Sequence, residues 1–295
     1  MRTDGDVWDI VSSVGRTALI VAAFRALETN LPDPLIQDDY AALFVEAAGE
    51  PRYIEVLADP TPFTDTPFLP GFMGYRTRFF DEFFLSATAS GVRQAVIVAS
   101  GLDARAYRLD WPAGTTVFEI DQPKVLEFKQ RVLTEHHAQP KADRRVVAVD
   151  LRDDWPAALL AAGFDTGQPA VWSAEGLLPY LPGAAQDALF ERIHQLSGSG
   201  SRLGVENSVT KADFNRMMAV TSKYFDTNPF DDVDPSDLFY DDERADPIQW
   251  LTDNGWSVRT HTPVELSTAY GRSVAEIPEE LIELWGRPRY LTAVR

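Results

Sequence analysis

Four short apolar runs end in a glycine or an acidic residue, where a parallel sheet would present these residues to a ligand. The stretch AVIVASGLDARAYRL (95–109) leaves its apolar run through Ser-Gly at Gly101, and the next three runs end at Asp121, Asp150 and Glu175. Open α/β sheets bind ligands at the edge where the carboxyl ends of their parallel strands meet. Each acidic residue alone would also suit a cap or a turn. Four such run ends in succession, one with a glycine and three with acidic residues, predict a binding site at this edge.

The residue types at these positions indicate a nucleoside ligand. Asp121 lies twenty residues after Gly101, where an acidic side chain can accept hydrogen bonds from both hydroxyls of a ribose. Asp150, or a backbone amide beside it, can contact an adenine edge, and Leu151 can pack on the adenine face. The turn after the first run has one glycine where the dinucleotide fingerprint has three, so close approach of the backbone to a pyrophosphate is unfavourable.

Arg76 indicates a carboxylate on the same ligand. A helix over 75–89 would place Arg76 within an apolar sector made of Tyr75, Phe79, Phe80, Phe83 and Phe84. A buried guanidinium needs a paired anion, and its planar fork suits a carboxylate. The alternatives are snorkelling to the rim or an internal ion pair with Asp81 or Glu82. Arg78 is the second candidate for binding the ligand carboxylate.

S-adenosylmethionine contains a ribose, an adenine and an amino-acid carboxylate but no phosphate, and it fits these residues better than NAD does. We therefore expect S-adenosyl-L-methionine as the cofactor. Two alternatives stay open. An NAD-dependent oxidoreductase would use the same Asp121, and a non-catalytic nucleoside-binding protein of the same fold would keep the same pocket residues.

The elements that would position these residues alternate between strands and helices. Apolar runs bounded by turn signals predict strands at 95–99, 116–120, 145–149, 170–174 and 202–205. Segments of helical length between them predict helices at 122–138, 154–162 and 183–197. This alternation is typical of a parallel, doubly wound α/β sheet. A helix at 246–254 and late strands within 255–262 and 288–295 would complete about seven strands.

Two regions lie outside this repeating pattern. Residues 1–91 look helical, apart from a Pro-rich loop at 59–72, and predict an N-terminal helical cap on a nucleoside-binding domain at 92–295. Residues 207–247 form an insertion before the last two strands, where a lid over the crevice could lie. Aromatic residues in the cap and insertion suggest an apolar small-molecule acceptor, or a core: Phe68, Phe72, Phe225, Phe230 and Phe239.

Composition excludes several classes of protein. A formal charge of −18 argues against a nucleic-acid partner, which would require a basic face. The chain has no cysteine, so disulfides, thiolate catalysis and Cys-based zinc sites are excluded. The acidic piece DDVDPSDLFYDDERAD lacks the spacing of a calcium loop, and we expect no metal. We find neither a signal-peptide core nor a run of roughly 18 apolar residues, which predicts a cytoplasmic protein without a membrane anchor.

The joint motif set resembles a known family. The segments ASGLDARAYRL, FEIDQPKVLEFK, VAVDLRDDW and EGLLPYLP, with the helix YRTRFFDEFF, are similar to the leucine carboxyl methyltransferase-like family, and most of all to its bacterial branch of S-adenosylmethionine-dependent methyltransferases. The resemblance runs from about residue 12 to the C-terminus. It implies a Rossmann-like class I methyltransferase fold: a seven-stranded, mostly parallel sheet with an antiparallel last strand, helices on both faces and a helical cap.

The resemblance also implies roles for the residues singled out above. It places the methionine carboxylate on Arg76, the methionine chain on the backbone of Ala99 to Gly101, the ribose on Asp121, the adenine on Asp150 and Leu151, and the methionine end of the site on Glu175. Many members have Gly-Ala where this chain has Ala99 and Ser100. This difference affects the expected geometry of the turn but not the expected cofactor.

The implied reaction is O-methylation of a carboxylate or a hydroxyl on a small molecule, with a protein carboxylate as the other acceptor. Methyl transfer from a sulfonium is an in-line displacement in which the protein chiefly positions the acceptor. A carboxylate needs no base, whereas a hydroxyl would use one. Tyr180 is the hydroxyl expected nearest the acceptor, and its alternative role is that of a core aromatic residue whose hydroxyl is hydrogen-bonded.

Overall fold

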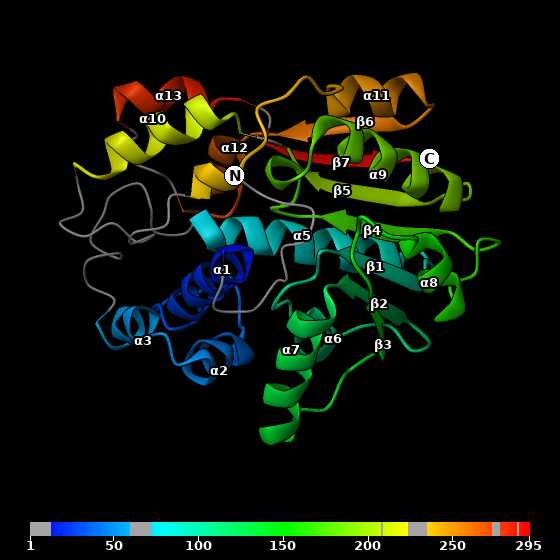
Figure 1. Cartoon of the computed structure of the whole chain (residues 1–295), viewed down its shortest axis with the longest axis horizontal. Helices are drawn as coiled ribbons and strands as arrows, with labels where there is room; N and C mark the ends of the chain where they lie inside the picture. The colour runs from blue at the N-terminus through cyan, green and yellow to red at the C-terminus, as the bar shows by residue number, and fades with distance from the viewer. Residues whose placement is uncertain (1–12, 60–71, 208, 224–234, 273–277, 288) are drawn as a thin grey trace.

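Seven strands form one sheet in the computed structural model, which describes residues 13–59, 72–207, 209–223, 235–272, 278–287 and 289–295 (Figure 1). The strand order is β3-β2-β1-β4-β5-β7-β6. Neighbouring strands among β1 to β5 pair in parallel, and β7 pairs antiparallel with both β5 and β6. The bounds are β1 (Gln94–Val98), β2 (Thr116–Asp121), β3 (Asp143–Ala148), β4 (Ala170–Ala174), β5 (Arg202–Glu206), β6 (Ser257–His261) and β7 (Tyr290–Val294). The predicted seven-stranded, mostly parallel sheet with an antiparallel last strand is confirmed.

Helices cover both faces of this sheet. The helices that follow the strands are α6 (Arg105–Arg108), α7 (Pro123–Glu135), α8 (Trp155–Ala161), α9 (Gly183–Leu196), α11 (Pro247–Asp253), α12 (Pro263–Ala269) and α13 (Glu279–Trp285). Alternate residues of β1 enter two separate cores: Ala95 and Ile97 one, Val96 and Val98 the other. Burial on both faces explains why β1 is a continuous apolar run.

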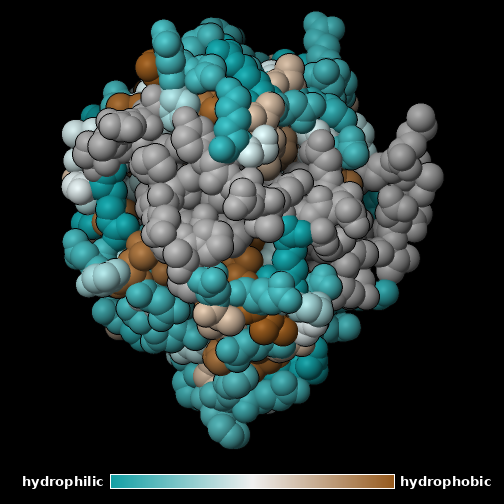
Figure 2. Space-filling model, turned by 90° about the vertical axis from the view of Figure 1, so that its left-hand side faces the viewer, coloured by the Kyte–Doolittle hydropathy of each residue, from teal (hydrophilic) through white to brown (hydrophobic). Residues whose placement is uncertain are grey.

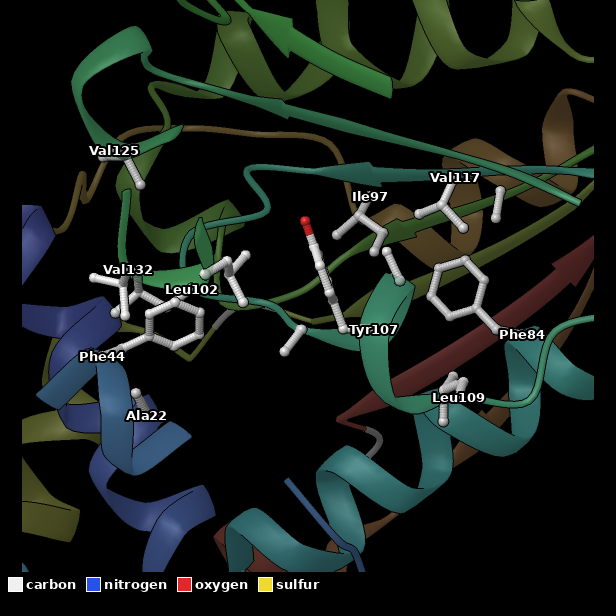
Figure 3. Close-up of a cluster of buried hydrophobic side chains, with 14 of the residues drawn as sticks. Ala22, Phe44, Phe84, Ile97, Leu102, Tyr107, Leu109, Val117, Val125 and Val132 are labelled. Carbon is white, nitrogen blue, oxygen red and sulfur yellow. The ribbon is translucent and has the colours of Figure 1, made fainter. Parts of the chain in front are cut away.

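The N-terminal helices pack onto one of these two cores. They are α1 (Ser13–Thr29), α2 (Asp39–Ala48), α3 (Pro51–Ala58) and α5 (Phe72–Ala89). Asp38 caps α2, accepting a hydrogen bond from the backbone N–H of Tyr40 at 3.2 Å. In Figure 3, Ala22 of α1, Phe44 of α2 and Phe84 of α5 meet side chains from β1, β2 and α7. This region therefore shares its core with the sheet, and the division of the chain into a helical cap at 1–91 and a domain at 92–295 stays a prediction.

The insertion between β5 and β6 contains α10 (Lys211–Thr221) and the short η2 helix (Pro235–Leu238). Figure 2 shows the end of the molecule that carries α1, α3 and α10, where hydrophilic side chains dominate the described surface and hydrophobic ones gather in small groups. Phe72 and Phe239 belong to the described structure, whereas the predictions for Phe68, Phe225 and Phe230 fall outside the described residues. None of the described helices is both long and apolar enough to span a bilayer.

Gly204 permits α5 to lie close against β5. A Cβ atom at Gly204 would come within 2.9 Å of a Phe83 ring carbon and 3.2 Å of one in Phe80. We expect Gly204→Ala to lower the free energy of unfolding by about 1–3 kcal/mol, the usual cost of overpacking. Gly198→Ala is the matched control, because its nearest contact would be an ordinary 3.8 Å. Urea denaturation checks both variants, and equal stability of the two would contradict this account of Gly204.

Candidate functional site

A cavity of about 660 Å³ opens at the carboxyl ends of the parallel strands. Its volume lies within the range of about 300–1,000 Å³ typical of small-molecule sites. The lining includes every residue for which the sequence predicts a site role: Arg76, Ala99, Gly101, Asp121, Asp150, Leu151, Tyr180 and Glu175. Arg78, the second candidate for the carboxylate, is absent from the described lining and pairs with Glu82 instead.

The turn after β1 is tied to the end of β2. Ala99 has a φ of +54°, a left-handed conformation uncommon for a residue with a Cβ, and Gly101 has a φ of +49°. The carboxylate of Asp121 accepts hydrogen bonds from the backbone N–H groups of Gly101, at 2.6 Å, and of Gln122, at 2.7 Å. Burial raises the pKa of Asp121, although both hydrogen bonds oppose the rise. Each carboxylate oxygen keeps a second lone pair for a ligand.

Asp150 follows β3 and is held by two neighbours. Its carboxylate accepts hydrogen bonds from the guanidinium of Arg152, at 2.6 Å, and from the side-chain amide of Gln122, at 2.5 Å. Burial would raise the pKa of Asp150, but the hydrogen bonds from Arg152 outweigh burial and lower it. Leu151 packs against the second core. Because the Arg152 guanidinium is half exposed, a ligand could displace it from Asp150 at little cost.

Glu175 forms an ion pair with Arg105, a buried arginine for which the sequence suggests no role. Both nitrogens at the end of the Arg105 side chain donate to Glu175, at 2.6 and 3.1 Å. The same guanidinium donates to Asp103 at 2.6 Å and to Asp81 at 2.7 Å. Burial opposes ionisation of Asp103, but the charges of Arg105, Lys129 and Arg108, with a hydrogen bond from the Arg105 backbone, together outweigh burial and lower the pKa of Asp103. Arg105 therefore fixes three carboxylates around one point of the cavity wall.

This ion-pair cluster continues to the N-terminal helices. Asp81 also pairs with Arg108 at 2.5 Å, Arg108 lies 3.9 Å from Asp38, and Arg25 pairs with Asp38 at 2.8 Å. We call the whole set the acidic cluster: Arg25, Arg105 and Arg108 with Asp38, Asp81, Asp103 and Glu175. Three positive and four negative charges leave it with one negative charge in excess.

Arg76 is buried as predicted, but its partner is neither Asp81 nor Glu82. The Nε and Nη2 atoms of Arg76 lie 2.9 and 2.8 Å from one oxygen of Glu206. The other oxygen of Glu206 accepts from Arg289 at 3.1 Å. We call Arg76, Glu206 and Arg289 the basic cluster, because two guanidinium groups share one carboxylate. Glu206 ends β5, so it continues the pattern of acidic strand ends and could have been found from it.

The two clusters flank a single turn after β4. Glu175 belongs to the acidic cluster, and the backbone N–H of Gly176 donates to Glu206 of the basic cluster at 2.9 Å. A Cβ atom at Gly176 would come within 3.3 Å of Arg76, and the residue has a φ of +59°. Glycine is therefore required here both by conformation and by the close approach of the guanidinium.

Tyr180 lies in the short helix η1 (Leu178–Tyr180) and lines the cavity. Its ring contacts Phe239 of the insertion edge-to-face, with 5.2 Å between ring centroids. Burial raises the pKa of the Tyr180 hydroxyl to about 12. Tyr180 is therefore a neutral phenol at physiological pH and a poor general base.

Glu206 makes stability depend on pH. Burial opposes its ionisation, but Arg76 and Arg289 outweigh burial and lower the pKa of Glu206. Its stabilising contribution is therefore full above the unfolded pKa of about 4.3 and is lost as pH falls through the lower folded value. We expect Glu206→Gln to cost about 3 kcal/mol at pH 7, because it leaves a buried guanidinium without its counter-ion.

The difference between wild type and Glu206→Gln should shrink as the pH falls below about 4. Urea denaturation at a series of pH values measures it, with the exposed Glu127→Gln as the matched control. A difference that stays constant down to pH 3 would contradict the ion-paired state of Glu206.

Comparisons with known proteins show the family of this chain. The chain matches the family model of leucine carboxyl methyltransferase over residues 18–194. A protein of Rhodococcus jostii (strain RHA1), named as an S-adenosyl-L-methionine-dependent methyltransferase, is 68% identical over 100% of both chains. A similarly named protein of Mycobacterium tuberculosis (strain ATCC 25177 / H37Ra) is 50% identical over 100% of this chain and 97% of its own.

Solved structures give more distant matches. Magnesium protoporphyrin IX methyltransferase from Synechocystis PCC 6803, crystallised with S-adenosylhomocysteine (SAH), has a TM-score of 0.48 and 16% identity, with 88% of this chain and 100% of the other covered. The family model and the two relatives above 30% identity establish membership on their own. The chain belongs to the leucine carboxyl methyltransferase family, a family of S-adenosylmethionine-dependent methyltransferases.

Proposed function

We propose that this chain transfers the methyl group of S-adenosylmethionine to an oxygen atom, of a carboxylate or a hydroxyl, on a small molecule. The observation that carries the proposal is the charge of the cavity wall. The acidic cluster has one negative charge in excess, and the basic cluster has one positive charge in excess. These excesses match the ammonium and carboxylate groups of an amino acid, and the two clusters meet at Glu175 and Gly176.

The remaining predicted residues would hold the rest of the cofactor. Asp121 has lone pairs for the ribose hydroxyls, and Asp150 with Leu151 would contact the adenine. The methionine chain would cross the backbone of the turn from Ala99 to Gly101, which Asp121 fixes in place. An amino-acid zwitterion distinguishes this cofactor from NAD, whose pyrophosphate would meet the carboxylates of the acidic cluster.

The chain's own contribution to catalysis is placement. The bound cofactor supplies a sulfonium whose methyl group is already activated for displacement. The wall of the cavity excludes water and holds the acceptor oxygen in line with the methyl carbon, which supplies up to about 7–11 kcal/mol when alignment is good. Tyr180, as a neutral phenol, would donate a hydrogen bond to the acceptor rather than remove a proton from it.

Calorimetric titration tests this function. SAH should bind with a dissociation constant in the micromolar range. 5′-Methylthioadenosine has the same nucleoside and sulfur but lacks the amino acid, so we expect it to bind at least about tenfold more weakly, the effect of one lost charge-assisted hydrogen bond. NAD should not bind. Equal binding of SAH and 5′-methylthioadenosine would contradict the role of the two clusters, and NAD binding without SAH binding would contradict the function.

A further inference from the structure

Two arginines converge on one carboxylate in the basic cluster, and they differ in how firmly they are held. Arg76 reaches Glu206 at 2.8 and 2.9 Å, and its side chain is 9% exposed. Arg289 reaches Glu206 at 3.1 and 3.3 Å, and its side chain is 24% exposed. Arg289 is thus the guanidinium more open to the cavity. A guanidinium has five N–H donors, so two bonds to Glu206 leave donors for a ligand.

The surroundings of Arg289 are apolar and aromatic. Its guanidinium lies 5.7 Å from the centroid of the Phe72 ring. Tyr180 and Tyr240 line the same cavity. The positive charge of Arg289 acts to lower the pKa of the Tyr180 hydroxyl, although burial raises that pKa overall. Phe72, Tyr180 and Tyr240 are separate from the residues proposed above for the cofactor. Arg289 belongs to the basic cluster, in which Arg76 is the residue proposed to hold the cofactor carboxylate. Arg289 and the three aromatic residues are what this part of the cavity offers to a methyl acceptor.

The described part of the cavity wall offers no group suited to act as a general base. It contains no histidine, and the pKa of Tyr180 is raised to about 12. The carboxylates of the wall other than Asp121 are all committed to ion pairs: Asp38, Asp103, Asp150, Glu175 and Glu206. Asp121 accepts hydrogen bonds from two backbone amides. An alcohol or phenol would need such a base, whereas a carboxylate is already ionised at neutral pH.

We propose that Arg289 binds the carboxylate of the acceptor and thereby selects small apolar carboxylic acids over alcohols and phenols. This inference rests on the proposed methyl transfer. A carboxylate oxygen attacks the methyl carbon, the bond from that carbon to sulfur breaks, and its electron pair stays on sulfur. The products are a methyl ester and the thioether SAH, and no proton is transferred. The neutral ester loses its attraction to Arg289, which favours its release.

The test compares matched acceptors that differ only in the reacting group. The panel contains 3-phenylpropanoic acid, octanoic acid and N-acetyl-leucine, each with its primary alcohol and its amide, and a peptide with a free C-terminal leucine. Methyl uptake from isotopically labelled S-adenosylmethionine is measured for wild type, Arg289→Gln and Arg289→Lys. The matched control is Arg259→Gln, which removes an exposed arginine on β6. SAH affinity is measured by calorimetry for each protein.

We expect small acids to be methylated and their alcohols and amides to react at least about 100-fold more slowly, because a neutral acceptor forms no ion pair with Arg289. Arg289→Gln should lower kcat/KM for the acids by about 100-fold and SAH affinity by much less, because Arg76 keeps its place beside the cofactor carboxylate although the basic cluster loses its positive excess. Arg289→Lys should restore part of the activity, and Arg259→Gln should behave as wild type.

Several results would overturn the assignment of Arg289. They are an alcohol methylated as fast as its acid, no uptake by any acid although SAH binds, and a preference for the peptide over all small acids. A loss of SAH affinity equal to the loss of kcat/KM in Arg289→Gln would also overturn it, because Arg289 would then act through Glu206 and Arg76. Failure of the wild-type protein to bind SAH would instead overturn the proposed function.

Discussion

Asp121→Asn is expected to weaken SAH binding by about 100-fold or more, the effect of losing two charge-assisted hydrogen bonds. The carboxylate of Asp121 has two functions in this account. It would accept hydrogen bonds from the ribose, and it accepts the backbone N–H groups of Gly101 and Gln122 at 2.6 and 2.7 Å. The Asn side chain has the same shape but places an NH₂ donor where one of these acceptor oxygens stood. The hydrogen bonds to the ribose and to the turn at Ala99 to Gly101 are therefore weakened.

Calorimetric titration of wild type and Asp121→Asn with SAH measures this effect. Asp110→Asn is the matched control, because Asp110 is exposed and pairs only with Lys141 among the described residues. Urea denaturation shows whether Asp121→Asn remains folded. Since burial raises the pKa of Asp121, the ionised carboxylate already costs stability there, and its replacement should not unfold the protein. Affinity close to wild type in a folded Asp121→Asn variant would rule out the ribose role.

Among the variants proposed for this protein, Arg105→Met should cause the largest fall in the free energy of unfolding. The guanidinium of Arg105 is 2% exposed and donates to Asp81, Asp103 and Glu175 at 2.6 to 3.1 Å. Among the described residues, Arg105 is the cation paired with Asp103 and Glu175, so its removal leaves two largely buried carboxylates of the cavity wall without a counter-ion. Breaking a buried ion pair in this way costs about 3–5 kcal/mol. We expect the free energy of unfolding to fall by that amount, and SAH affinity to fall with it because Glu175 loses its fixed position.

Urea denaturation of Arg105→Met and Arg131→Met separates this effect from a general effect of removing arginine. Arg131 lies on α7 in an exposed pair with Glu135, and its loss should cost less than about 1 kcal/mol. Arg105→Lys keeps the positive charge but loses the planar, bidentate guanidinium, so it should retain part of the stability that Arg105→Met loses. Similar losses in Arg105→Met and Arg131→Met would show that the acidic cluster does not hold the cavity wall.

Much of the fold and part of the site could be predicted from local sequence. Turn signals bound β1, β2, β4 and β5, which are largely apolar because both faces of the sheet are covered there. The edge strand β3 is more exposed and more polar. Parallel pairing then brings the ends of those strands together, which is why Gly101, Asp121, Asp150 and Glu175 line one cavity. The buried position of Arg76 also followed from the period of the helix that carries it.

The partners of the charged residues could not be predicted in the same way. Arg76 pairs with Glu206, which lies 130 residues away, and Arg105 pairs with Glu175 across 70 residues. Such contacts depend on the tertiary arrangement of α5, α6 and two strands, which no local period encodes. No pattern in the sequence marks Arg289 as a site residue, because only the folded structure brings it to the carboxylate of Glu206 that it shares with Arg76. Glu206 is the exception, since it stands at a strand end like the three acidic residues that were recognised.

A crystal structure of the protein with SAH is the most direct test of the central claim. The account predicts the ribose hydroxyls at about 2.7–2.9 Å from the carboxylate of Asp121, the distance of a charge-assisted hydrogen bond. It places the ammonium group beside Glu175 and the carboxylate beside Arg76, so that the amino acid spans the acidic and basic clusters. SAH bound with its amino acid away from both clusters, or bound outside this cavity, would contradict the account.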